Sequence, residues 1–121
     1  MDAVLMLKTA VTLFAIAAAG GLLMVGIRLM RRENPPVALA MLHGLLAAAA
    51  LALSAYAVFT AALPRLAMIA LVLLLAAAAG GAVLNLSYQW KQRLLPIGLT
   101  MAHAGLALVG FALLCVAAFG H

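Results

Sequence analysis

The sequence predicts an all-α membrane protein, a four-helix transmembrane bundle made of two tandem two-helix repeats. The 121 residues are 70% hydrophobic and only 7% charged, which leaves too little polarity for a soluble domain of this size. The apolar residues form four runs, each long enough to cross the hydrocarbon layer as a helix of about 20 residues. The chain also matches itself without a gap when it is shifted by 60 residues.

We expect membrane helices at about residues 9–30, 37–60, 66–88 and 95–119, which together use nearly the whole of one membrane domain, residues 1–121. The strands of a β-barrel would alternate apolar and polar residues, and the alanine- and leucine-rich runs do not alternate. The first run is longer than the apolar part of a signal peptide and has a counterpart in the second half, so we interpret it as a retained helix.

The repeat consists of a first copy at about residues 1–61 and a second at about 62–121. Residue types that are hard to match by chance coincide: Gly20 and Gly21 with Gly80 and Gly81, Pro36 with Pro96, and His43 with His103. Each copy holds two helices, so the copies share one orientation and a pseudo-two-fold axis along the membrane normal. The simplest arrangement is an up-down-up-down bundle, with each proline in the first turn of the second helix of its repeat.

Basic residues lie at the helix ends, so the net charge of +5 does not indicate nucleic-acid binding. Five of them border the first and third connections, and only Lys8 and Arg65 border the opposite side. The positive-inside rule therefore predicts a bacterial inner-membrane protein with these two connections in the cytoplasm and both termini outside. The single cysteine, Cys115, excludes a disulfide framework and a thiolate metal cluster.

The predicted helices contain no Asp or Glu, but they contain two histidines, and ionisable residues inside a membrane are functional candidates by default. His43 and His103 each follow a proline by seven residues, about 10 Å into the membrane from the cytoplasmic side. The two glycine pairs on the preceding helices fall near the same depth. We therefore expect one layer with two imidazoles on one diagonal of the bundle and open space on the other.

A b-type haem would fit such a layer, with His43 and His103 as the two axial ligands. Small residues would admit the porphyrin edges, and polar residues nearer the surface would bind the propionates. Asn85 could also bond the free ring nitrogen of a ligand histidine. The residues expected around the haem, besides the histidines, are Gly20, Gly21, Arg28, Gly80, Gly81, Asn85 and Tyr88. A chlorin, a quinone headgroup, a divalent metal or plain interhelical hydrogen bonds by the histidines are alternatives that the sequence leaves open.

The paired Pro–(six residues)–His pattern resembles small uncharacterised bacterial four-helix membrane proteins with a duplicated hairpin. More loosely, two helices that each present one histidine resemble membrane-anchored b-type cytochromes, including the anchor subunits of respiratory enzymes. This resemblance implies axial roles for His43 and His103 alone. Many such cytochromes stack two haems on four histidines at two depths, whereas this chain has one level and supports at most one haem.

The main functional hypothesis is an electron-transfer subunit that works with a quinone or another membrane redox subunit. The alternative is a structural or assembly subunit of a respiratory or photosynthetic complex, without a cofactor of its own. A small transporter ranks lowest, because the helices contain no carboxylate and no obvious break. An enzyme is a less natural interpretation than an electron-transfer or accessory subunit, since the short loops leave little room for catalytic machinery.

Overall fold

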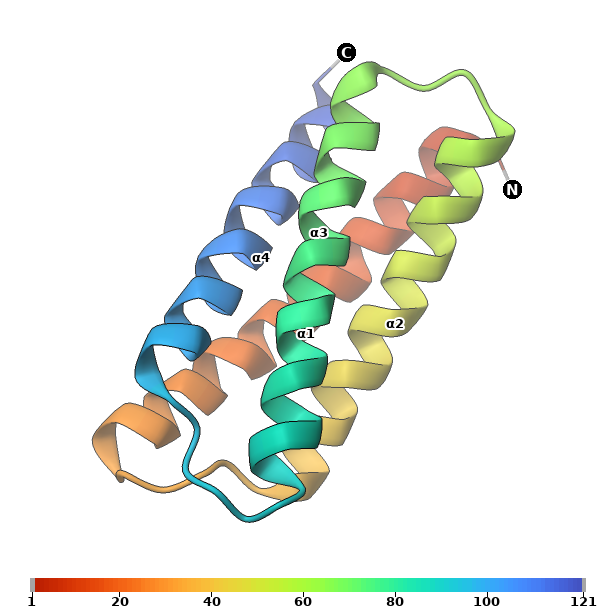
Figure 1. The fold of residues 1–121 in the computed structure, drawn as a ribbon. Helices are drawn as coiled ribbons and strands as arrows, with labels where there is room; N and C mark the ends of the chain where they lie inside the picture. Colours follow the sequence, from red (N-terminus) through yellow and green to blue (C-terminus); the bar gives the residue numbers. More distant parts are fainter. Residues whose placement is uncertain (1, 121) are drawn as a thin grey trace.

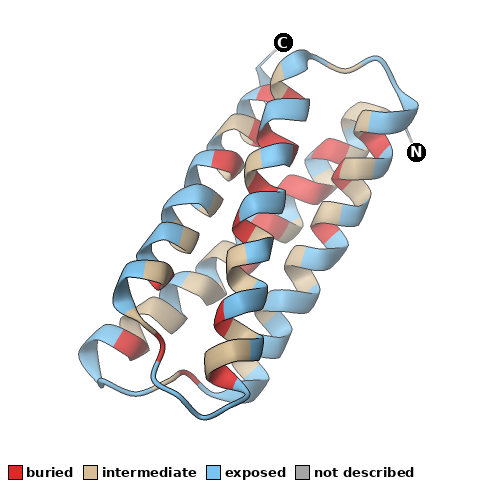
Figure 2. Ribbon diagram, viewed as in Figure 1, coloured by how far each residue is buried: buried red, intermediate tan, exposed pale blue. Residues whose placement is uncertain are grey.

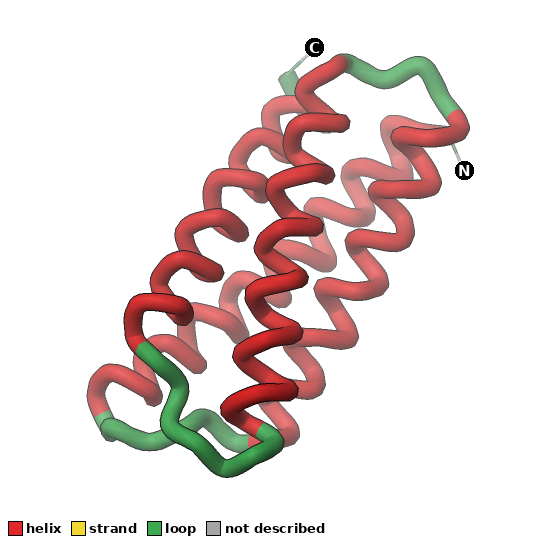
Figure 3. Tube along the Cα trace, in the orientation of Figure 1, coloured by secondary structure: helices red, strands yellow, loops and turns green. Residues whose placement is uncertain are grey.

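The computed structural model describes residues 2–120 and contains four long antiparallel helices joined by short loops (Figures 1 and 3). The helices are α1 (Ala3–Met30), α2 (Val37–Thr60), α3 (Arg65–Leu84), which continues into a π-helical turn, η1 (Asn85–Gln89), and α4 (Ile97–Phe119). Each of the four is long and apolar enough to cross a membrane, with η1 counted as part of the third. The predicted four-helix transmembrane bundle is confirmed, and the chain is a multi-pass membrane protein.

The helix starts are set by local capping. α1 begins well before the predicted residue 9 because the Asp2 carboxylate accepts a 2.8 Å hydrogen bond from the Leu5 N–H, an N-cap interaction. Pro36 and Pro96 are the N-cap residues of α2 and α4, one position outside the first turn in which the sequence placed them. Both prolines can serve there because an N-cap residue contributes its carbonyl, not its N–H, to the first helical bond.

The two helices of each repeat form the closest pairs, α1 with α2 and α3 with α4. α1 also packs along α4, and α2 touches α3 least. The helices therefore surround the bundle axis in chain order, which puts α2 and α4 on a diagonal. Both termini and the 61–64 connection lie at one end of the bundle, which we call the terminal end (Figure 1). The connections 31–36 and 90–96 lie at the other end, called the basic end after its arginines and lysine.

Several positions 60 residues apart have the same backbone conformation or the same burial. Arg32 and Gln92, in the two connections of the basic end, both adopt a left-handed backbone with φ of 53° and 54°. The pattern of burial along α1 recurs along α3 at the same interval. The buried pairs are Leu7 and Ala67, Ala10 and Ala70, Val11 and Leu71, Phe14 and Leu74, and Ala17 and Ala77.

The apolar core fills the half of the bundle nearest the terminal end, where buried side chains from all four helices meet (Figure 2). Ser54 on α2 and its counterpart Leu114 on α4 are fully buried there. Close to the basic end the buried residues include polar ones, Arg28 and Gln89, beside Leu84 and Leu95. Between these two regions lies the layer that contains the histidines, and it is much less tightly filled.

Candidate functional site: the histidine layer

Each histidine is held by a backbone carbonyl of the preceding helix. His43 Nδ1 lies 2.7 Å from the Ala17 carbonyl oxygen on α1, and His103 Nδ1 lies 2.6 Å from the Ala77 carbonyl oxygen on α3. A carbonyl oxygen can only accept, so Nδ1 of each ring carries the hydrogen and donates it. The neutral imidazole then has a lone pair on Nε2, the atom left free to bind a metal.

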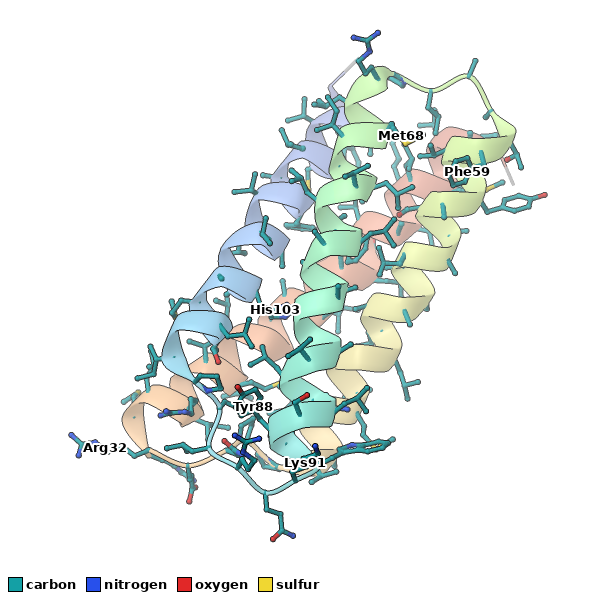
Figure 4. The ribbon with its side chains drawn as sticks, in the orientation of Figure 1. Arg32, Phe59, Met68, Tyr88, Lys91 and His103 are labelled. Atoms are coloured by element: carbon teal, nitrogen blue, oxygen red, sulfur yellow. The ribbon has the colours of Figure 1, made fainter. Side chains whose placement is uncertain are left out.

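The two rings meet across the bundle axis. Their centroids are 6.2 Å apart and their planes make an angle of 81°. Figure 4 shows His103 in the interior, between the helices. The structure thus brings together the two histidines that the sequence repeat aligned, and no bulky side chain separates them.

The glycines lie beside the histidines but have a different role from the one expected. A Cβ atom on Gly21 would stand 3.0 Å from His43 Cε1, and one on Gly81 would stand 3.0 Å from His103 Cε1. Gly80 is in looser contact with His103, and Gly20 meets only Leu39, at 4.0 Å. The imidazole rings therefore lie against Gly21 and Gly81, so these glycines make room for the histidines, and both also line the larger cavity described next.

Two cavities flank the histidine pair, and both histidines line each of them. The smaller one, about 100 Å³, extends between α1 and α4 from Phe14 to Phe111. The larger one, about 440 Å³, lies in the basic half of the bundle, between α2 and α3. The linings of the two cavities correspond through the repeat, since Ala47 and Ala48 in the larger match Ala107 and Leu108 in the smaller. They differ in size because α2 and α3 are packed less closely than α1 and α4.

The larger cavity is apolar along most of its wall and polar only toward the basic end. Met24, Met41, Leu45 and several alanines form its sides. Its polar lining residues, apart from the histidines, are Asn85, Gln89, Trp90 and Thr100. A volume of this size lies in the range of about 300–1,000 Å³ typical of small-molecule sites. The cavity suits a mainly apolar ligand with one polar edge.

The π-helical turn η1 changes which residue faces inward at the end of α3. In a regular α-helix Tyr88, seven residues after Gly81 and 60 after Arg28, would lie on the same face as Gly81 and Asn85. The wider turn at residues 85–89 rotates the chain by about one position, so Gln89 is buried there instead, with 8% of its surface exposed. The Tyr88 ring instead packs under the Arg93 guanidinium, at 5.0 Å. Asn85 does line the larger cavity, as predicted.

The basic end is closed by side chains that bind the opposite connection. Arg28 Nε donates to the Leu95 carbonyl oxygen at 2.7 Å, and Gln89 Nε2 donates to the Pro35 carbonyl oxygen at 2.7 Å. Residues 35 and 95 are equivalent in the repeat, so these are two corresponding bonds between the halves of the molecule. Arg28 lies beneath the third connection and does not itself line the larger cavity, but Leu95, to which it donates, does.

Two residues at this end were missed by the sequence analysis. One is Gln89, whose inward position follows from a π-turn that no pattern in the sequence marks. The other is Asn34, whose Nδ2 donates to the Arg93 carbonyl oxygen at 2.7 Å and whose Oδ1 accepts from the Leu95 N–H at 2.9 Å. An Asn-Pro-Pro sequence indicates a turn, but not that its side chain binds a loop 60 residues away.

Two histidines are too few for an ordinary protein-bound metal ion. Within residues 2–120 there is no group of three or more His, Cys, Asp or Glu side chains that could hold one. A porphyrin differs because it supplies four ligands itself and asks for only two from the protein. Comparison with known protein families, curated proteins and solved structures finds no match to this chain. The fold and site define a class, a multi-pass helical bundle with paired histidines in its interior.

Proposed function

We propose that the protein is a membrane b-type cytochrome subunit that holds one haem between His43 and His103. The single observation that carries the proposal is the pair of imidazoles facing across the axis, each with Nδ1 bonded to a carbonyl and Nε2 free. This is the arrangement of ligand histidines generally, in which the second ring nitrogen donates to a carbonyl and fixes the tautomer.

The separation of the rings fits a shared metal. A metal–imidazole bond is about 2 Å long, so two ligand nitrogens on opposite sides of one ion are about 4 Å apart and their ring centres somewhat farther. The observed centroid distance of 6.2 Å is compatible with this, without a large movement of α2 or α4. The carbonyl bonds to Ala17 and Ala77 would hold both rings in place.

The space around the rings fits a disc. His43 and His103 come from opposite hairpins, so a disc between them would lie between the α1–α2 pair and the α3–α4 pair. Its edges would then extend toward the α1–α4 and α2–α3 grooves, which is where the two cavities are. The larger cavity would take most of the macrocycle, and Asn85, Gln89 and Thr100 would face its polar substituents.

The function would be one-electron transfer, since a haem iron cycles between two oxidation states and two histidine ligands leave no position for oxygen. The chain's own residues would bind and orient the group, exclude water through the apolar cavity wall and keep both ligand nitrogens unprotonated. One haem at a single depth would carry electrons across only part of the bilayer. We therefore propose that electrons pass to or from a quinone or a second redox subunit.

The positive-inside rule assigns the basic end to the cytoplasm of a bacterial inner membrane, with both termini outside. The proposed haem would then lie nearer the cytoplasmic surface. Cysteine labelling from either side of sealed vesicles, at positions 33 and 62, tests this orientation. Labelling of position 62 from outside and of position 33 only after permeabilisation is expected, and the reverse pattern would contradict it.

The visible spectrum of the purified protein tests the proposal. Expressed in cells that make ample haem, the wild type should show a Soret band and, when reduced, a sharp α-band. His43→Ala and His103→Ala should each lose most of the pigment, because six-coordinate iron needs both ligands. The control is His103→Ala with imidazole added to the buffer, which should recover part of the spectrum. A colourless wild type, or pigment that is indifferent to both substitutions, would contradict the proposal.

A structural role without a cofactor is the second candidate, and the glycine contacts favour it. His43 against Gly21, and His103 against Gly81, are close ring-to-helix contacts that hold each hairpin together through the carbonyl bonds. In that case the wild type should carry no pigment, and His43→Ala and His103→Ala should each still lower the thermal stability of the protein in detergent. Wild-type protein that copurifies with a respiratory or photosynthetic complex, colourless by itself, would support this second function.

A further inference from the structure

Arg28 is a buried cation with no acidic partner. Only 7% of its surface is exposed, and its one side-chain hydrogen bond within residues 2–120 is from Nε to the Leu95 carbonyl oxygen. The chain has two acidic residues, and neither forms an ion pair with it in the described part. Asp2 caps α1 at the far end of the bundle, and Glu33 is exposed in the first connection. A buried charge without a partner is costly, so an ion from outside the chain is expected to neutralise it.

The terminal nitrogens of Arg28 are free to bind that ion. The two Nη atoms have no hydrogen-bond partner among residues 2–120. In that range only the Ser54 hydroxyl is both fully buried and without a partner, so the Nη atoms must be partly accessible. Nε is held by the Leu95 carbonyl, which fixes the plane of the guanidinium. An arginine that is fixed in this way presents its remaining N–H groups as a fork that suits a carboxylate or a phosphate.

The start of α4 adds to the positive potential at the same place. Leu95 directly precedes the N-cap Pro96, and no side chain caps this helix. The N–H groups of residues 97–99 precede the first helical bond, which Thr100 donates, so they have no helical partner. The space beside Gly98 is open, with nothing within 4 Å of the position of a Cβ. A helix N-terminus and an unpaired arginine side by side favour an anion.

We infer that Arg28 and the first turn of α4 form a binding site for the phosphate of an anionic phospholipid at the basic end. A lipid is favoured over a free ion because the site lies where a transmembrane helix ends, at the level of the headgroups, and because the two connections at this end carry four exposed basic residues, Arg31, Arg32, Lys91 and Arg93. The start of α2 lacks such a site, since neutral Gln89 there takes the place that Arg28 has at α4.

The second repeat supplies matched substitutions for the test. Arg28→Gln introduces the residue type that makes the equivalent bond in the second repeat, where Gln89 donates to the Pro35 carbonyl. The bond to the Leu95 carbonyl can then be kept while the charge is lost. Arg32→Gln is the control, because it removes an equally charged but exposed arginine and installs the residue found at position 92 with the same backbone conformation. Arg28→Lys, which keeps the charge, is the fallback should Arg28→Gln fail to fold.

The experiment is native mass spectrometry of the delipidated protein, titrated with phosphatidylglycerol or with phosphatidylcholine. The wild type and Arg32→Gln should bind the first phosphatidylglycerol about tenfold more tightly than phosphatidylcholine, and Arg28→Gln should lose that preference. Arg28→Lys should keep most of it.

Three results would overturn the inference. One is an equal lipid preference in Arg28→Gln and Arg32→Gln. Another is complete competition by inorganic phosphate at millimolar concentration, which would identify a site for free oxyanions. The third is loss of the preference when haem is added to the wild type, which would assign Arg28 to a haem propionate. The first two results do not depend on whether the histidines bind haem, so this test and that of the proposed function can fail separately.

Discussion

At the scale of single residues, each histidine is held by two features of the neighbouring helix. One is a backbone carbonyl that accepts from the imidazole, and the other is a glycine whose lack of a side chain leaves room for the ring. A glycine is needed at position 21 because the Cβ of any other residue there would lie 3.0 Å from His43 Cε1. The ring cannot move away without losing its bond to the Ala17 carbonyl. Spacing in the sequence could indicate that glycine and histidine share a level, but not that the one makes room for the other.

Gly21→Ala should therefore destabilise the bundle by about 1–3 kcal/mol, the usual cost of overpacking. Gly26→Ala is the matched control on the same helix, since nothing lies within 4 Å of its Cβ position. It should be neutral or stabilising by up to about 1 kcal/mol, because alanine is the better helix former. Thermal unfolding in detergent measures both. Equal stability of the two variants would show that the ring and the glycine are not in close contact.

At the scale of elements, the sequence predicted the number, order and approximate limits of the helices because apolar runs and prolines mark them directly. It did not predict η1, because a π-turn leaves no pattern of spacing and arises from the fit between α3 and the third connection. Tyr88 was therefore assigned an inward position that Gln89 occupies. Burial of the polar Gln89 is tolerable because its amide donates to the Pro35 carbonyl.

Gln89→Leu should cost about 1–3 kcal/mol, because it removes the donor to a buried carbonyl. Tyr88→Leu should cost less, since that side chain packs at the surface against Arg93. Chemical unfolding of each variant in mild detergent would rank them. The reverse order, with Tyr88 the more sensitive position, would indicate a regular α-helix through residues 85–89.

The two connections of the basic end are joined by Asn34, whose side chain bonds the Arg93 carbonyl and the Leu95 N–H. Asn34→Ala should lower stability by about 1–3 kcal/mol and loosen the basic end. Glu33→Ala, next to it and exposed, should have no measurable effect. Hydrogen exchange of the 90–96 segment reports the loosening, and unchanged protection in Asn34→Ala would refute this role.

At the scale of the whole molecule, the bundle is filled at the terminal end and hollow in the basic half, with the histidines at the boundary. Hydrophobic composition alone predicted a bundle, but it could not show where the packing is incomplete, because alanine-rich stretches suit both close helix contacts and cavities. Comparison of the two repeats shows how much the packing differs between the two sides of the bundle. Corresponding residues line a cavity of about 100 Å³ on one side and about 440 Å³ on the other.

Filling the cavity should separate binding from folding. Ala47 lines both cavities and lies one turn from His43, so Ala47→Phe should preserve the fold and reduce haem content at least tenfold. Ala49→Phe, on the exposed side of α2, should leave both unchanged. Haem content per folded protein is the measurement. Equal haem in the two variants would place the pigment outside the cavities.

Low-temperature electron paramagnetic resonance of the ferric protein reports whether both imidazoles bind one iron. The wild type should give a low-spin signal, with the large anisotropy expected of two nearly perpendicular imidazole planes, because the rings make an angle of 81°. Any iron left in His43→Ala or His103→Ala should be high-spin. A high-spin wild type, or a low-spin signal that survives either substitution, would contradict the account.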